Sequence, residues 1–303
     1  MPGIPFVKDI QFEYGRADRL SPLIRRVICN NPGPFTYTGS GTYIIGPDKG
    51  AVAVIDPGPQ NAAHLEALTA AIGKAAVSDI LITHTHSDHC GGARAFAETV
   101  GAPIRAMGPH PIVDKAHDAP ALDEGADYSF TPDTLLRDSE QISADGWTIE
   151  AIATPGHLSN HLCFALVEEG ALFTGDHIMG WATTVVAPPD GDMAAYFDSL
   201  DKLLARDDRV YYPTHGAPIV SPKPFVRAIR THRRIRDGQI LDQLKKGRTG
   251  IKEITETIYA DIDKRLHKAA ALNVYAHLIR LVKTGAVTCD GAPAMTSEYR
   301  PVD

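Results

Sequence analysis

Cysteine is scarce in this sequence, and the cysteines present are not paired. The 303 residues contain four of them, Cys29, Cys90, Cys163 and Cys289, and no two follow the CxxC spacing. The sequence therefore predicts neither a thiolate zinc site nor a disulfide framework. A reducing interior, taken here to be the cytoplasm, is the expected location.

Long hydrophobic runs are also missing. No apolar stretch approaches the roughly 18 residues that a membrane-spanning helix needs. The opening residues lack the basic and then apolar pattern of a secretory signal. With 44% hydrophobic and 22% charged residues, the composition is that of an ordinary globular protein. We expect no association with a membrane.

Charge of one sign dominates each part of the chain. Residues 1–220 contain 14 basic and 28 acidic side chains, whereas residues 221–303 contain 16 and 9. This reversal predicts one domain over residues 1–220 and a second over residues 221–303. The basic C-terminal part indicates either an acidic partner or attraction between the two domains.

Short apolar runs are interspersed with amphipathic segments in the first 220 residues. We expect strands near residues 42–46, 51–55, 79–83, 103–107, 147–153, 161–167, 171–174 and 210–212, and helices after Asn61, from Ala93 and over residues 192–205. Residues 1–40 are expected to be irregular, and residues 108–140 a long loop or short helices. Such a pattern predicts an α+β fold, with sheets covered by helices.

The C-terminal part has a different character. Helices are expected from about residue 222 to 246, over 251–259 and over 266–284, followed by a short extended piece at 286–288. Three helices and a short extended tail predict a small second domain.

The densest group of chemically reactive side chains lies at residues 83–90, which read Thr-His-Thr-His-Ser-Asp-His-Cys. Alternate residues of an extended segment share a face, so His84 and His86 can converge on one cation. Asp88 and His89 lie beyond the predicted turn and can reach a second cation. Imidazole and carboxylate groups suit zinc, iron or manganese.

Polar residues follow several other predicted strands. Asp56 follows one strand, His157 ends a Thr-Pro-Gly-His run, Asp176 ends Thr-Gly-Asp, and His215 lies in Thr-His-Gly. Small residues beside each would let the backbone approach a crowded centre. This shared placement at strand ends indicates one common site.

Further candidates for proton transfer or substrate binding flank these positions. They are His161, His177 and Tyr212, together with His110 and His117 in the long loop. Cys90 adjoins His89, but a small buried residue is the expected role there.

Taken in order, His84-x-His86-x-Asp88-His89, His157, Asp176 and His215 resemble the motifs of the metallo-β-lactamase superfamily. The resemblance covers residues 42–216. It implies a four-layer αβ/βα sandwich with two metals at one edge. By that resemblance, one metal is held by His84, His86 and His157, the other by Asp88, His89 and His215, with Asp176 bridging them and Asp56 steadying the ligand loops.

The resemblance also implies the chemistry. Two Zn²⁺ per chain are expected, although iron or manganese would suit the same ligands. A metal-bridging hydroxide would attack an ester, thioester, lactone or phosphodiester, and Asp88 would help to orient it. Lactam-cleaving relatives usually place a Cys near the second metal. Asp176 on that strand argues against antibiotic hydrolysis.

Residues 31–36, 41–43, 175–177 and 183–186 and the C-terminal run at 222–290 resemble the lactamase-like-protein-2 group. That group has a winged-helix-like C-terminal domain and includes an endoribonuclease. A metal-dependent single-strand endoribonuclease is therefore an alternative function. An iron-dependent oxidoreductase similar to the persulfide dioxygenases and a nucleic-acid-binding regulator with structural metals are further alternatives. The sequence departs from this group at Gly39-Ser40-Gly41, where relatives commonly have Gly-Thr-Asn, and this departure bears on substrate preference.

A group of arginines bears on the choice between a small ester-type substrate and RNA. Arg227, Arg230 and Arg234 fall on one helical stripe, with Arg233 and Arg236 beside it. Such a stripe could contact the phosphates of a nucleic acid. It could equally face water or pair with the acidic first domain.

Overall fold

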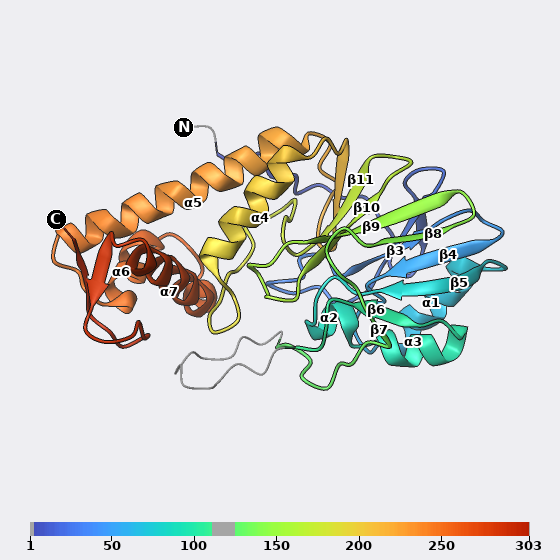
Figure 1. Ribbon diagram of the computed structural model, residues 1–303, viewed down its shortest axis with the longest axis horizontal. Coiled ribbons are helices and arrows are strands. Elements are labelled where there is room, and N and C mark those ends of the chain that lie inside the picture. The colour runs from blue at the N-terminus through green and yellow to red at the C-terminus, as the bar shows by residue number, and fades with distance from the viewer. Residues whose placement is uncertain (1–2, 111–124, 303) are drawn as a thin grey trace.

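Two β-sheets pack face to face in the computed structural model, which describes residues 3–110 and 125–302 (Figure 1). In spatial order the larger sheet contains β1 (Ala17–Arg19), β2 (Ile24–Ile28), β3 (Gly41–Ile45), β4 (Ala51–Ile55), β5 (Ala76–Leu81), β6 (Ile104–Ala106) and β7 (Thr134–Leu135). Strands β1 to β4 pair antiparallel, whereas β4 to β7 pair parallel. The parallel arrangement places the C-terminal ends of β4 and β5 at the same sheet edge.

The smaller sheet is mostly antiparallel. Its order is β12 (Val210–Pro213), β11 (Ala171–Gly175), β10 (Leu162–Leu166), β9 (Trp147–Ala153) and β8 (Gln141–Ala144). Only β11 and β12 pair parallel in this sheet. Tyr43 and Ile55 of the larger sheet meet Trp147, Phe164 and Phe173 of the smaller one in the core between the sheets.

Helices cover the outer face of each sheet. Helices α1 (Ala62–Ile72) and α3 (Ala93–Val100) pack on the larger sheet through Leu68, Ile72 and Phe96, and α2 (Ser87–Cys90) is a single turn before α3. Helices α4 (Met193–Ala205) and α5 (Pro222–Lys245) cover the smaller sheet. The four layers agree with the expected αβ/βα sandwich.

The C-terminal part has a core of its own. It contains α6 (Ile251–Ile258), a 3₁₀ turn (Lys264–Leu266), α7 (His267–Lys283) and the antiparallel pair β13 (Val287–Cys289) and β14 (Tyr299–Pro301). Its buried residues include Ile254, Tyr275 and Tyr299. None of the described helices is long and apolar enough to cross a membrane.

The 24-residue helix α5 belongs to two cores at once. Near its start, Phe225, Val226 and Ile229 pack with α4 against the smaller sheet. Near its end, Ile240 and Leu244 pack with α6 and α7. Since one helix contributes to both cores, the predicted division at residue 220 remains a prediction.

The expectation that residues 1–40 are irregular is wrong, because β1 and β2 lie there. Strand β2 was not predicted because two arginines interrupt its apolar sequence, Ile-Arg-Arg-Val-Ile. Both are buried: Arg25 donates to the carbonyl of Ala71, and Arg26 donates to the Asp18 carboxylate. Strands β7 and β8 were also not predicted. Strand β7 lies within residues 108–140, for which a long loop or short helices were expected. Residues 111–124 of that stretch are outside the described residues.

The double role of α5 gives a stability prediction. Ile229→Ala should lower the free energy of unfolding by about 2–5 kcal/mol, because it opens a cavity between α5 and the smaller sheet. Ile235 lies on the same helix and is 37% exposed. Ile235→Ala is therefore the matched control, with an expected change within about 0.5 kcal/mol. Chemical denaturation of both variants measures the difference, and equal losses would contradict this packing.

Candidate metal centre

The His-rich turn lies directly after β5, where the chain changes from extended to helical. His84 and His86 precede α2, and His86 is the last extended residue before it, with φ −74° and ψ 142°. Asp88 and His89 lie within α2. This change of conformation turns the two pairs of side chains in different directions. All four approach the edge at which the other polar strand ends meet.

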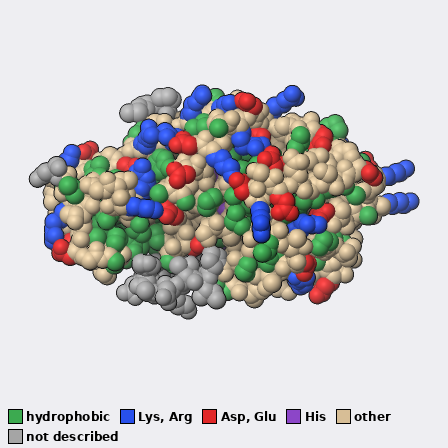
Figure 2. Space-filling view, viewed as in Figure 1, with side chains coloured by type: hydrophobic (Ala, Val, Ile, Leu, Met, Phe, Trp, Pro, Cys, Tyr) green, Lys and Arg blue, Asp and Glu red, His purple; other side chains and the backbone are tan. Residues whose placement is uncertain are grey.

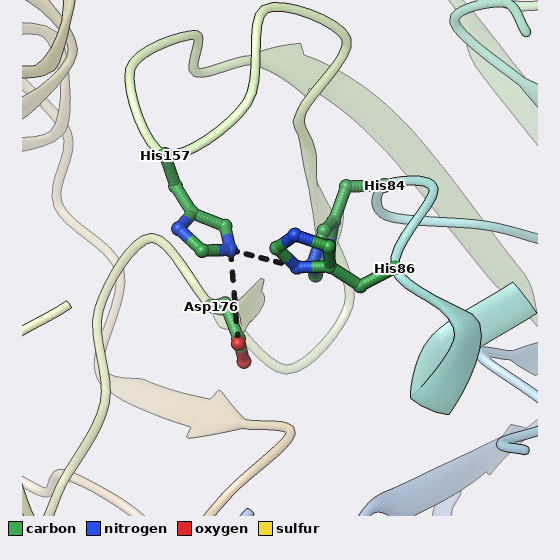
Figure 3. Close-up of side chains that lie close together, drawn as sticks. All are labelled: His84, His86, His157 and Asp176. Atoms are coloured by element: carbon green, nitrogen blue, oxygen red, sulfur yellow. Dashed lines mark hydrogen bonds and ion pairs between the residues drawn. The ribbon is translucent and has the colours of Figure 1, made fainter. Parts of the chain in front are cut away.

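A first cluster of side chains contains His84, His86, His157 and Asp176, whose candidate ligand atoms lie within 4.8 Å of one another (Figure 3). The His86 Nδ1 atom lies 2.9 Å from His84 Nε2 and 3.1 Å from His157 Nε2. Like-charged imidazolium rings would repel at these distances. The arrangement suits neutral imidazoles whose lone pairs point at a shared cation.

A second cluster contains Asp88, His89 and His215, again with ligand atoms within 4.8 Å of one another. The His215 Nε2 atom lies 3.2 Å from Asp88 Oδ2, and His89 Nε2 lies 3.5 Å from the same oxygen. All three side chains are buried. Their donor set of two imidazoles and one carboxylate suits a divalent metal ion.

Asp176 lies between the two clusters. Its Oδ2 atom is 3.9 Å from His157 Nε2, whereas its Oδ1 atom is 3.4 Å from His215 Nε2 and 3.5 Å from His89 Nε2. Each carboxylate oxygen thus faces a different cluster. Gly175 beside it has φ +49°, and a Cβ there would lie 2.7 Å from His161 Nε2. Only glycine allows this approach without displacing a neighbouring side chain.

Asp56 connects three of the loops that carry these residues. Its Oδ1 accepts from the Thr83 backbone N–H at 2.8 Å, and its Oδ2 accepts from the Thr83 hydroxyl at 2.7 Å. The same Oδ2 accepts from His89 Nδ1 at 2.8 Å and lies 3.3 Å from the Thr214 hydroxyl. Asp56 therefore connects the loops that carry the candidate ligands by hydrogen bonds, which is the supporting role that the resemblance implies for it.

Hydrogen bonds also set the ring orientation of three histidines. The His89 Nδ1–H group faces the Asp56 carboxylate at 2.8 Å. The His157 Nδ1–H group faces the Val185 carbonyl at 2.6 Å, and the His215 Nδ1–H group faces the Gly39 carbonyl at 3.2 Å. An Nδ1–H donor leaves the lone pair on Nε2, which is the atom facing the clusters.

Buried atoms without partners show that the clusters fit a cation. Within the described residues, His89 Nε2 and Asp176 Oδ1 have no hydrogen-bond partner, although both are fully buried. Unpaired buried polar atoms are costly and rare in folded proteins. A metal ion between them would satisfy both atoms.

The pKa shifts of the metal-free chain agree with ligand chemistry. Burial, with the neighbouring His157, lowers the pKa of His86 to about 3, so its ring is neutral at physiological pH. Burial alone would lower the pKa of His89, but Asp88, Asp176 and Asp56 raise it well above its ordinary value. Protonation of His89 would therefore compete with metal binding at this ring.

Several residues that support the site were not predicted from the sequence. Ser40 donates to Asp88 Oδ2 at 2.9 Å, and the Asn31 amide holds Ser40 at 3.0 Å. Ser40 belongs to Gly39-Ser40-Gly41, where the sequence departs from the lactamase-like-protein-2 pattern, whereas Asn31 lies in the part that resembles it. The Thr184 hydroxyl donates to the Asp176 carbonyl at 2.6 Å. Their supporting roles depend on hydrogen bonds between separate segments of the chain, so no pattern of residue types shows them.

The remaining candidates have other roles. His161 supports the site: its Nε2 accepts from the Asp176 backbone N–H at 3.3 Å. Tyr212 packs in the core between the sheets, and Cys90 is buried beneath α3, as expected for a small apolar residue. His177 is buried against the Tyr196 ring, and His110 contacts the Thr85 hydroxyl. His117 lies outside the described residues.

A pocket opens over both clusters. It is lined by Phe35, Thr36, His86, Asp88, His157, Asp176, Met179, Val185 and His215. Apart from the candidate ligands and Thr36, the lining is apolar. Among the residues that the structure describes, no Lys or Arg lines this pocket.

Comparison with known proteins agrees with this architecture. Residues 38–215 match the family model of the metallo-beta-lactamase superfamily, and residues 251–294 match the beta-lactamase associated winged helix domain. The second match confirms the winged-helix-like part that the resemblance implied.

Individual relatives cover most of the chain. A beta-lactamase-like protein 2 homolog of Caenorhabditis elegans is 32% identical over 290 residues, covering 95% of this chain and 91% of the relative. An atrochrysone carboxyl ACP thioesterase of Aspergillus fumigatus is 34% identical over 234 residues, covering 74% of this chain and 65% of the relative.

A solved structure shows the same fold over both parts of the chain. The crystal structure of a metallo-beta-lactamase family protein from Thermus thermophilus superposes with a TM-score of 0.73 at 24% identity, covering 94% of this chain and 100% of that one. With the family match over residues 38–215 and the clustered His and Asp side chains, the chain belongs to the metallo-beta-lactamase superfamily and is one of its metal-dependent hydrolases.

Proposed function

We propose that this chain is a dinuclear, zinc-dependent hydrolase of ester or thioester substrates. In this proposal His84, His86 and His157 hold one metal, and Asp88, His89 and His215 hold the other. Asp176 bridges the two. The observation that supports the bridge is the position of the Asp176 carboxylate, whose two oxygens face different clusters.

Two bound cations would supply Lewis acidity and lower the pKa of a water molecule between them. The chain's own residues provide the rest of the centre. Asp88 lines the pocket, and because Ser40 donates to one of its oxygens, its orientation is restricted. That placement suits a carboxylate that orients an attacking water. Asp56 and Val185 hold the ligand rings in place.

The lining of the pocket favours a neutral acyl group over a phosphodiester. Phe35, Met179 and Val185 place apolar surface beside the candidate ligands, and the described part of the lining contains no Lys or Arg side chain that could pair with a phosphate. Residues 1–220 carry twice as many acidic as basic side chains. This excess would repel a polyanion that approaches the pocket.

The relatives point in the same direction. Two of those matched, from Aspergillus fumigatus and Aspergillus chevalieri, are named atrochrysone carboxyl ACP thioesterases. A thioester has an uncharged carbonyl group, and an acyl chain attached to it can supply apolar surface. Both features suit a pocket with apolar side chains next to a metal centre.

A second candidate, a single-strand endoribonuclease, is favoured by the winged helix match. The arginines of α5 give it little support. Arg230 pairs with Asp201, Arg233 is buried, and Arg236 stacks on the Tyr259 ring. Arg227 and Arg234 remain exposed. On the face shown in Figure 2, basic and acidic side chains are interspersed rather than gathered into one basic stripe.

The metal content tests the proposed centre. Gently purified protein should contain about two zinc ions per chain, as expected for a two-metal site. Asp176→Asn should lower the metal content and reduce kcat/KM on the order of 100-fold or more. The control is Asp198→Asn, an exposed carboxylate on α4. Iron as the principal metal would favour the oxidoreductase alternative instead, and full activity after metal removal would contradict the proposal.

Substrate preference tests the acyl assignment. In a panel of thioesters and esters of increasing acyl length, kcat/KM should rise by up to about fourfold per methylene, the effect of burying about 0.8 kcal/mol each. Phe35→Ser should weaken this dependence on chain length more than it affects an acetyl ester. A higher kcat/KM for phosphodiesters than for thioesters would favour the second candidate.

The salt dependence of RNA binding tests that second candidate directly. An RNA-binding surface that includes Arg227 and Arg234 predicts that log affinity falls with log salt by about 0.7 per phosphate contacted. Changing both residues to Gln would then flatten the slope by about 1.4. The thioesterase proposal predicts weak RNA binding and no change of slope in this variant.

A further inference from the structure

An irregular segment supports two of the proposed metal ligands. Residues 182–187 have no regular secondary structure, yet the Val185 carbonyl accepts from His157 Nδ1 at 2.6 Å. The Thr184 hydroxyl reaches the carbonyls of Asp176 at 2.6 Å and His177 at 3.0 Å. Groups that hydrogen-bond a metal-binding side chain from behind set its orientation and basicity. The position of this segment therefore matters for both clusters.

Arg233 of α5 holds this segment. Its guanidinium donates to the Thr184 carbonyl and, at 3.1 Å, to the Asn273 side-chain oxygen on α7. The same group lies 5.1 Å from the centre of the Tyr196 ring, whose hydroxyl donates to the His177 carbonyl at 2.9 Å. A path of contacts thus runs from α5 and α7 to Thr184 and, through Tyr196, to His177.

The burial of Arg233 argues against a role in packing alone. The side chain is only 1% exposed, and the hydrogen-bond partners that the described residues give it are neutral oxygens. Its Nε has no partner among those residues. A buried cation without a carboxylate partner is costly, and an apolar side chain of similar size would fill the same space at lower cost.

We infer that Arg233 is a positioning residue for the metal centre, acting through Thr184 and Val185 on Asp176 and His157. The inference rests on the proposed function, since it assumes that these two residues bind metal. In this inference, helices α5 and α7 help to set the geometry of the metal centre through Arg233 and Asn273. It also removes Arg233 from the residues that a nucleic acid could reach.

Zinc affinity, measured by competition with a chromophoric chelator on the full chain, tests this inference. Arg233→Met keeps much of the volume but removes both hydrogen bonds. It should weaken zinc binding by up to about 10-fold, because losing a group bonded directly to a metal ligand costs about 10- to 100-fold and Arg233 acts one contact further away. The visible absorption bands of the cobalt(II)-substituted protein should shift as well. Arg233→Lys, which keeps the charge and one donor, should recover part of the affinity.

Two further variants define the mechanism. Arg234→Met changes the exposed neighbour on the same helix and should leave zinc affinity and the cobalt bands unchanged. Thr184→Val removes the hydroxyl that reaches Asp176 and should weaken zinc binding. Because both residues act through one segment, the Arg233→Met/Thr184→Val double variant should lose less affinity than the two single losses multiplied together.

The outcomes separate the inference from the proposed function. If the parent chain binds zinc and Arg233→Met binds it with equal affinity and the same cobalt bands, the inference is wrong and the metal centre stands. A lower melting temperature of metal-free Arg233→Met with unchanged zinc affinity also overturns it. If Arg233→Met does not fold, unchanged zinc affinity in Arg233→Lys and Thr184→Val overturns it. A parent chain that binds no metal would overturn both proposals.

Discussion

The arrangement of the metal centre depends on one buried carboxylate. Asp56 accepts hydrogen bonds from the loop after β5 and from α2, and it lies within 3.3 Å of the hydroxyl in the loop after β12. These loops come from different sheets, so their relative positions are not determined by strand pairing. Asp56 has φ +50°, an unfavourable value for a residue other than glycine. The hydrogen bonds that it makes compensate for that conformation and connect the edges of the two sheets.

The C-terminal part is integrated with the catalytic part rather than appended to it. The start of α5 covers the smaller sheet, and the end of the same helix belongs to the core of the winged helix part. Arg233 extends this integration from packing to chemistry, because it contacts the segment that supports two proposed ligands. A rigid helix that spans both cores is a physical reason for a hydrolase to retain a winged helix without using it to bind nucleic acid.

The proposed preference for a neutral acyl substrate rests on charge and on the pocket lining. The acidic surplus of residues 1–220 and the apolar side chains beside the candidate ligands both disfavour a polyanion in the pocket. Three of the arginines that suggested RNA binding have partners within the chain: Arg230 forms an ion pair, Arg233 forms buried hydrogen bonds and Arg236 makes a cation–π contact. The same residues thus explain why a basic stripe in the sequence need not be a basic surface.

The sequence by itself determined the chemistry that is possible here and most of the strands that carry it. His84, His86, Asp88 and His89 could be recognised because ligand residues cluster after an apolar strand, and His157, Asp176 and His215 because each follows a strand beside small residues. Strand β2 escaped prediction because Arg25 and Arg26 interrupt its apolar pattern, and their partners lie elsewhere in the chain. Only the tertiary structure decided which oxygen of Asp176 faces which cluster, and that Ser40 and the Val185 carbonyl contact proposed ligands. The reason is that neutral hydroxyl and carbonyl groups occur everywhere in a sequence, and only folding shows which of them lie within hydrogen-bond distance of a ligand.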